Sequence, residues 1–176
     1  AAQYHFGSRD GLVEAVVTAR MGPINERRLA LLAALGEEPP LRAVVAALVE
    51  PLAEATLGRP GSCWARFLLQ GWIDPAVADV VRRSFEASSF RTVRTLLVDA
   101  AAHVPEPLRA RRVDQAVAFV VMSLAAAEAA AAGGRRSRLS TAATTADLVD
   151  ACCGLLRAPT SPTTEHELDG RHAHPA

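Results

Sequence analysis

The chain begins Ala1-Ala2-Gln3-Tyr4-His5-Phe6-Gly7-Ser8-Arg9-Asp10-Gly11, a run that predicts the end of one helix, a two-residue turn and the start of another helix. Gly7 supplies the break, because glycine tolerates the backbone conformations of tight turns. Ser8 is a good N-cap, since its hydroxyl can accept a hydrogen bond from an otherwise unpaired amide of the first turn. Asp10 then lies near the positive end of the new helix, where a carboxylate is favourable. We therefore expect two helices to meet at residues 7 and 8.

The nine residues from Tyr4 to Leu12 resemble the pattern Tyr-His-Phe-x-Ser-Lys-Glu-x-Leu, which closes the helix-turn-helix of TetR-family bacterial transcription regulators. The likeness continues to Leu35, and residues 21–29 resemble the helix that joins the DNA-binding head of that family to its regulatory body. Arg9 stands where the family has lysine, which keeps the positive charge, and Gly11 stands where a better helix former is usual. Because the chain begins inside the motif, we expect the first two helices of the head to be absent and this chain alone to bind an operator poorly.

The resemblance also implies partners and contacts. Gln3, Tyr4, His5 and Arg9 would contact operator DNA, mainly its backbone. A small effector would bind among the central helices, and a two-fold homodimer would read a palindromic operator. No cofactor is implied.

The composition predicts an all-α fold. Half of the 176 residues are hydrophobic, Ala, Leu, Arg and Glu favour helices, and alternating β-branched runs are missing. Together with the resemblance, this predicts a TetR-like helical regulatory domain preceded by a remnant of the recognition helix. We expect residues 1–7 to end the DNA-binding domain, residues 8–157 to form the ligand-binding and dimerisation domain, and residues 158–176 to be a disordered tail.

The net charge of zero gives the body no general electrostatic reason to bind nucleic acid or an anionic membrane. The three cysteines form no spaced disulfide framework, which favours a reducing, cytoplasmic setting. Residues 116–132 look superficially like a membrane span. They are interrupted by Ser123 and Glu128 and are shorter than the roughly 20 apolar residues that a span needs, so we expect a buried interface helix and no membrane partner.

Apolar spacing and Pro or Gly punctuation predict the helices in order. We expect one from Ser8 to Leu35 with a kink or break at Pro23, and further helices over residues 41–57, 63–72, 74–103, 108–132 and 145–157. The tail from Ala158 is rich in Pro, Thr, Ser, Gly and His and offers nothing for a core.

The few aromatic residues of the chain are concentrated in its central helices, which suggests an apolar ligand cavity there. The predicted pocket residues are Trp64, Phe67, Trp72, Phe85, Ser88, Thr92, Phe119 and Met122. Ordinary core packing of the same side chains is an equal alternative.

Two helices with narrow apolar stripes and many small alanines predict a dimer surface, because small residues let helix backbones approach closely. The predicted interface residues are Val113, Val117, Val120, Leu124, Leu148, Cys152 and Leu155. The alternative is that both helices are buried within one monomer.

Two candidate chemical sites carry less weight. The run Gly61-Ser62-Cys63-Trp64 resembles the segment around the nucleophile of papain-like cysteine proteases, but the Asn that would orient a His is missing downstream. His166, His172 and His174 have no cysteine or carboxylate framework for a metal, so no metal site is expected. We expect a ligand-responsive DNA-binding regulator, a repressor rather than an enzyme. The alternatives are a helical dimerisation module without a ligand and a cysteine enzyme that uses Cys63.

Overall fold

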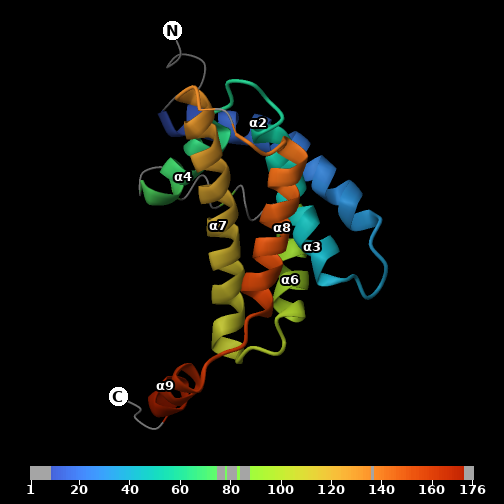
Figure 1. Ribbon diagram of the computed structural model, residues 1–176, viewed down its shortest axis with the longest axis vertical. Coiled ribbons are helices and arrows are strands. Elements are labelled where there is room, and N and C mark those ends of the chain that lie inside the picture. The colour runs from blue at the N-terminus through green and yellow to red at the C-terminus, as the bar shows by residue number, and fades with distance from the viewer. Residues whose placement is uncertain (1–8, 75–77, 79–82, 84–87, 136, 173–176) are drawn as a thin grey trace.

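The computed structural model describes residues 9–74, 78, 83, 88–135 and 137–172 of the chain (Figure 1). Within those residues it contains seven helices and no strand, which confirms the predicted all-α fold. The helices are α2 (Arg9–Ala33), α3 (Leu41–Thr56), α4 (Trp64–Ile73), α6 (Ser88–Ala100), α7 (Glu106–Ala132), α8 (Thr141–Arg157) and α9 (Pro162–His172).

Helix α2 begins at Arg9, one residue after the predicted cap, and continues through Pro23 to Ala33. Proline has no amide hydrogen and cannot complete the bond to the carbonyl four residues earlier, which here belongs to Ala19. The helix nevertheless continues without a break at Pro23. The predicted DNA contacts Gln3, Tyr4 and His5 lie outside the described residues, and so does the side chain of Arg9.

Helices α7 and α8 form an antiparallel hairpin, and α9 lies beyond its open end (Figure 1). The turn between them contains Gly134 at φ 74°, a left-handed conformation that favours glycine. Helix α8 starts four residues earlier than predicted, because the Ser140 hydroxyl accepts a hydrogen bond from the Ala143 amide at 3.1 Å and caps the helix. Helix α3 packs on α8, α2 and α6, while α4 packs on α7.

One hydrophobic core joins six of the described helices, from α2 to α8. Each helix contributes buried apolar side chains at helical spacing, which is why the apolar stripes read from the sequence face inward. Representative members are Val17, Ile24, Val45, Leu48, Trp64, Leu68, Val93, Leu97, Val113, Val120, Leu148 and Leu156.

The prediction of a disordered tail is wrong for residues 162–172, which form α9. The Ser161 hydroxyl accepts a hydrogen bond from the Thr164 amide at 3.3 Å, and Pro162 occupies the first helical position, where its missing amide hydrogen costs nothing. Thr160 donates a hydrogen bond to the Glu165 carboxylate at 2.7 Å across the same turn. Helix α9 extends away from the other helices, so it adds nothing to the core (Figure 1).

Among the described helices, α7 is the one long and apolar enough to cross a membrane by length and composition, a test that core helices of soluble proteins also pass. In this fold α7 lies against α4, α6 and α8 and buries eight of its residues, including Glu128. The buried face of α7 is therefore part of the core.

Candidate functional site

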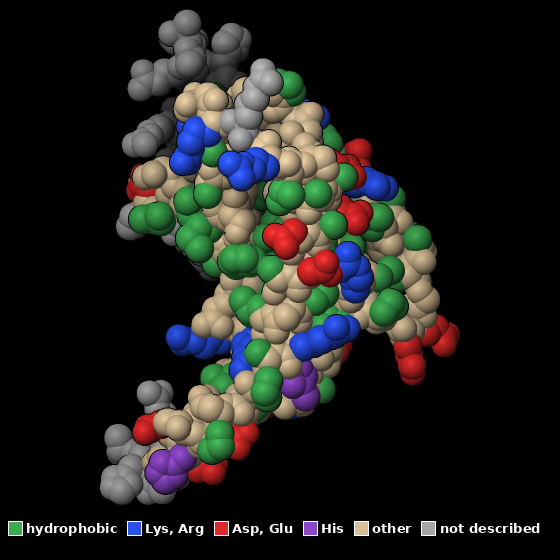
Figure 2. Space-filling view, in the orientation of Figure 1, with side chains coloured by type: hydrophobic (Ala, Val, Ile, Leu, Met, Phe, Trp, Pro, Cys, Tyr) green, Lys and Arg blue, Asp and Glu red, His purple; other side chains and the backbone are tan. Residues whose placement is uncertain are grey.

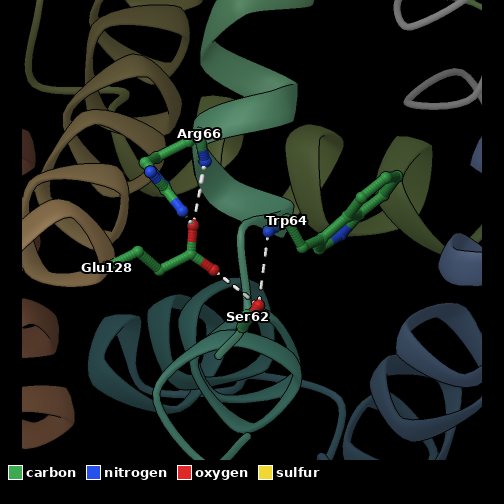
Figure 3. Close-up of polar contacts among 4 residues, drawn as sticks. All are labelled: Ser62, Trp64, Arg66 and Glu128. Carbon is green, nitrogen blue, oxygen red and sulfur yellow. Dashed lines mark hydrogen bonds and ion pairs between the residues drawn. The ribbon is translucent and has the colours of Figure 1, made fainter. Parts of the chain in front are cut away.

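The best-defined polar site lies where α4 begins against α7 (Figure 3). The Glu128 side chain of α7 is only 2% exposed. Its carboxylate accepts a hydrogen bond from the Ser62 hydroxyl at 2.6 Å and another from the Arg66 backbone amide at 3.0 Å. Ser62 also accepts a bond from the Trp64 amide at 3.3 Å. A carboxylate at a helix N-terminus satisfies unpaired amides and interacts well with the helix dipole. Glu128 therefore acts as an N-cap supplied by another helix and fixes α4 on α7.

This anchoring positions an aromatic pair on α4. Trp64 and Phe67 stack with ring centroids 5.2 Å apart and planes inclined by 11°. Trp64 is buried, and its ring points away from Glu128 (Figure 3). The indole Nε1 is buried without a hydrogen-bond partner in the described chain. Trp64 also lines a small cavity of about 50 Å³ between α2, α3 and α4.

A second polar cluster surrounds Arg28, which is 1% exposed and joins α2, α3 and α6. Its Nε donates to the Ala47 carbonyl at 3.3 Å, and its Nη1 donates to Asn25 Oδ1 at 3.0 Å and to Ser89 Oγ at 3.3 Å. The guanidinium lies 5.9 Å from the centre of the Phe90 ring. No carboxylate contacts it in the part of the chain that the structure describes. Burial lowers the pKa of Arg28 to about 10, so it stays cationic at neutral pH.

A larger open groove of about 560 Å³ lies on the surface where α3 meets the start of α8. Its α3 wall carries Arg42, Glu50 and Glu54, and its α8 wall carries mainly Thr and Ala side chains. Arg42 is ion-paired with Asp150 beside it. The volume lies within the range of small-ligand sites. None of the sequence-predicted pocket residues lines this groove.

The structure brings together only part of the predicted ligand pocket. Trp64 and Phe67 meet on α4, and Phe119 is half-buried against the core. Thr92 and Met122 are exposed, so they do not line an internal cavity. Phe85 lies outside the described residues, as do the side chains of Trp72 and Ser88. Among the aromatic residues that the structure describes, Trp64 fits ordinary core packing, because its side chain is buried.

The predicted dimer residues are mostly core residues of a single chain, which corrects the prediction. Within the monomer six of these residues are at most 5% exposed: Val113, Val117, Val120, Leu124, Leu148 and Cys152. They are covered by the same chain, since α7 packs on α4, α6 and α8, and α8 packs on α3 and α7. A side chain buried in its own chain has no surface left for a second copy. Leu155 is half-buried at the edge of this core.

The cysteines and histidines show no catalytic or metal-binding arrangement within the described chain. Cys63 is exposed and precedes α4. Among the residues that the structure describes, no group of three or more His, Cys, Asp or Glu side chains lies close enough to hold a metal ion. Cys152 is buried, and burial together with the neighbouring Cys153 raises its pKa to about 12. A thiol with so high a pKa is a poor nucleophile at neutral pH.

Sequence reasoning missed Arg28, Asn25 and Glu128 as site residues. Arg28 follows Ile24 by four residues and Met21 by seven, a spacing that places it on the buried face of α2. Glu128 similarly follows Leu124 by four residues. A charged residue at the same helical spacing as an apolar stripe is the sequence signal that indicates Arg28 and Glu128.

These elements define an all-α domain in which six described helices share one core and a seventh extends from it. No protein-family model, no curated protein and no solved structure matches the chain.

Proposed function

We propose that this chain is the regulatory body of a TetR-like, ligand-responsive DNA-binding regulator that acts as a repressor. The observation that carries the proposal is that the segment resembling a recognition helix continues directly into α2. The run from Tyr4 to Leu12 resembles the end of a recognition helix, and α2 starts at Arg9 inside that run. A single helix therefore leads from the predicted DNA-reading segment into the core.

Helix α2 is well suited to carry a signal. Its 25 residues extend about 37 Å at the usual helical rise. Met21, Ile24 and Arg28 anchor its middle in the core against α3 and α6. A ligand that changed the packing of those helices would move α2 as a unit and shift the segment attached to its start.

The homodimer part of the proposal uses the outer face of the α7–α8 hairpin. Met122 is 55% exposed, and Ala118 and Ala126, four residues to either side of it, are exposed on the same face. On α8, Ala151 is exposed and Leu155 is half-buried. Figure 2 shows hydrophobic side chains along α7, with acidic side chains beside them over α8. Small apolar residues on a helix pair suit a four-helix interface with a second copy.

In this mechanism, an effector binds the body better in one arrangement of α2 than in the other. The two heads of the dimer then change their separation and lose their fit to the operator. The difference in effector affinity between the two arrangements sets the largest possible loss of operator affinity.

The test uses the protein expressed from the complete reading frame that contains this chain. Selection from a random double-stranded DNA library should enrich a two-fold symmetric sequence with half-sites about one helical turn or more apart. Tyr4→Ala and His5→Ala should each reduce affinity for that sequence. His103→Ala, an exposed histidine in the α6–α7 connection, is the matched control and should bind like the parent. Enrichment of no sequence would exclude the proposed function.

A further inference from the structure

The groove of about 560 Å³ where α3 meets α8 is walled mainly by small side chains. The two helices pack against each other, and short side chains on their facing surfaces leave the hollow between them. The uncharged lining residues are Ala46, Gly58, Thr141, Ala142, Thr145, Ala146 and Val149. A groove of this volume accommodates a drug-sized molecule, since small-ligand sites enclose roughly 300–1,000 Å³. It therefore offers such a molecule apolar contacts from both helices.

One of the charged groups in this groove has no partner. Arg42 is ion-paired with Asp150, and Glu54 is ion-paired with Arg27 of α2 at 3.3 Å. Glu50 also lines the groove and is half-buried, and it forms no ion pair among the residues that the structure describes. Glu50 and Glu54 are one helical turn apart, a spacing at which like charges destabilise a helix. The groove thus carries one uncompensated negative charge beside its apolar walls.

The hydroxyl on the opposite wall also favours a hydrogen-bond donor as ligand. Thr145 donates its hydroxyl hydrogen to the Thr141 carbonyl at 2.9 Å, so its oxygen is left as an acceptor. The ionised carboxylate of Glu50 is likewise an acceptor only. A ligand that supplies both positive charge and several N–H donors satisfies these groups best, because charge-assisted hydrogen bonds are the strong ones.

We propose that this groove binds a primary amine in its ammonium form, with an apolar body attached. The ammonium group would donate hydrogen bonds to Glu50 and Thr145, and the apolar body would contact Ala46, Ala146 and Val149. A metal ion fits the groove less well. Hard cations need six or more oxygen ligands, and no group of three candidate metal-binding side chains lies together in the described part of the chain.

The groove also contacts the helix that we propose carries the signal. An ammonium group beside Glu50 would compete with Arg27 for the Glu54 carboxylate and so weaken a contact between α3 and α2. This would make an amine the effector of the regulator, and only this consequence rests on the proposed function. Amine binding is measured on this chain without DNA. A failure to bind amine therefore leaves the regulator proposal standing, and a failure to bind operator leaves the amine site standing.

The test is an NMR titration of the ¹⁵N-labelled chain with 4-phenylbutylamine at pH 7 and constant ionic strength, where an alkyl amine is fully protonated. Saturating shifts should be largest for amide signals of residues 46–50 and 142–149. Glu50→Gln keeps an acceptor oxygen but removes the charge, and it should weaken binding at least tenfold. Glu38→Gln, at an exposed position outside the groove, is the control and should bind within twofold of the parent.

A second pair of variants tests the location without changing charge. Ala146→Phe fills the groove and should weaken binding at least fivefold. Ala143→Phe is the matched control, because Ala143 is exposed on the same helix but does not line the groove. Equal effects of these two variants would overturn the proposed location.

Two ligands of similar shape test the chemical class. The neutral 4-phenylbutanol should bind at least tenfold more weakly than the amine, and the anionic 4-phenylbutyrate should bind more weakly still. Three results would each overturn the proposal: no saturable shift with the amine, full affinity in Glu50→Gln, and equal affinity for the alcohol, which would mean apolar contact alone.

Discussion

Replacing Glu128 with alanine should lower the free energy of unfolding by about 4 kcal/mol, because the buried carboxylate holds the start of α4 on α7. It accepts hydrogen bonds from the Ser62 hydroxyl at 2.6 Å and the Arg66 amide at 3.0 Å. Hydrogen bonds to a charged group contribute roughly 1.5–3 kcal/mol each, and alanine leaves both donors unpaired. The Arg66 guanidinium, 4.0 Å away and 42% exposed, adds little.

The conservative variant separates charge from hydrogen bonding. Glu128→Gln keeps an acceptor oxygen of similar reach but loses the negative charge at the helix N-terminus, so it should cost about 1–2 kcal/mol. Glu26→Gln, at an exposed position on α2, should stay within about 0.5 kcal/mol of the parent.

The assay is urea unfolding followed by far-ultraviolet circular dichroism, with linear extrapolation to water. The denaturant dependence should be the same for all four proteins, so that differences in midpoint report stability. A Glu128→Ala protein within 1 kcal/mol of the parent would refute the capping role of Glu128. Equal losses in the Gln and Ala variants would refute the hydrogen-bond part of the reasoning.

Three further predictions concern other parts of the fold. Arg28→Met should be neutral or stabilising by up to about 2 kcal/mol in the same urea assay, because a buried charge with only neutral partners is exchanged for an apolar chain of similar length; a loss above 2 kcal/mol would contradict this. Because the pKa of Cys152 is raised, the folded state holds the thiol proton more tightly than the unfolded state does. The stability that the neutral thiol contributes is complete below about pH 9 and is lost as the pH rises toward 12. Between pH 8 and pH 10 this loss is about 1.4 kcal/mol, and unfolding curves of Cys152→Ala should lack it. Met122→Glu should abolish a dimer of twice the 18.6 kDa chain mass in light scattering, whereas Leu139→Glu, equally exposed at 55%, should leave it intact.

The sequence predicted most of the helices because their signals are local. Apolar residues at helical spacing and the Pro or Gly residues between them placed α2, α3, α4, α7 and α8 within a few residues of their bounds. The incorrect prediction of a disordered tail also has a local cause. Ser161-Pro162 is a good helix start, but the polar composition of the following residues favoured disorder.

The functional faces were harder to predict because they depend on which helices meet. An apolar stripe shows that a helix buries one side, but it does not say whether the cover is the same chain or a second copy. The stripe that contains Val113 and Val117 therefore predicted a dimer surface, although both residues are buried within the monomer. The partners of Arg28 and Glu128 are up to 66 residues away in sequence, a separation that no local pattern encodes.

In the proposed regulator, a ligand bound in the helical body weakens operator binding through α2. The direct measurement is the dissociation constant of the protein from the complete reading frame for its selected operator, with and without a ligand found by thermal shift. We expect a ligand that raises the melting temperature to weaken operator binding at least fivefold, the lower range of typical allosteric coupling. Equal operator affinity with every bound ligand would contradict it.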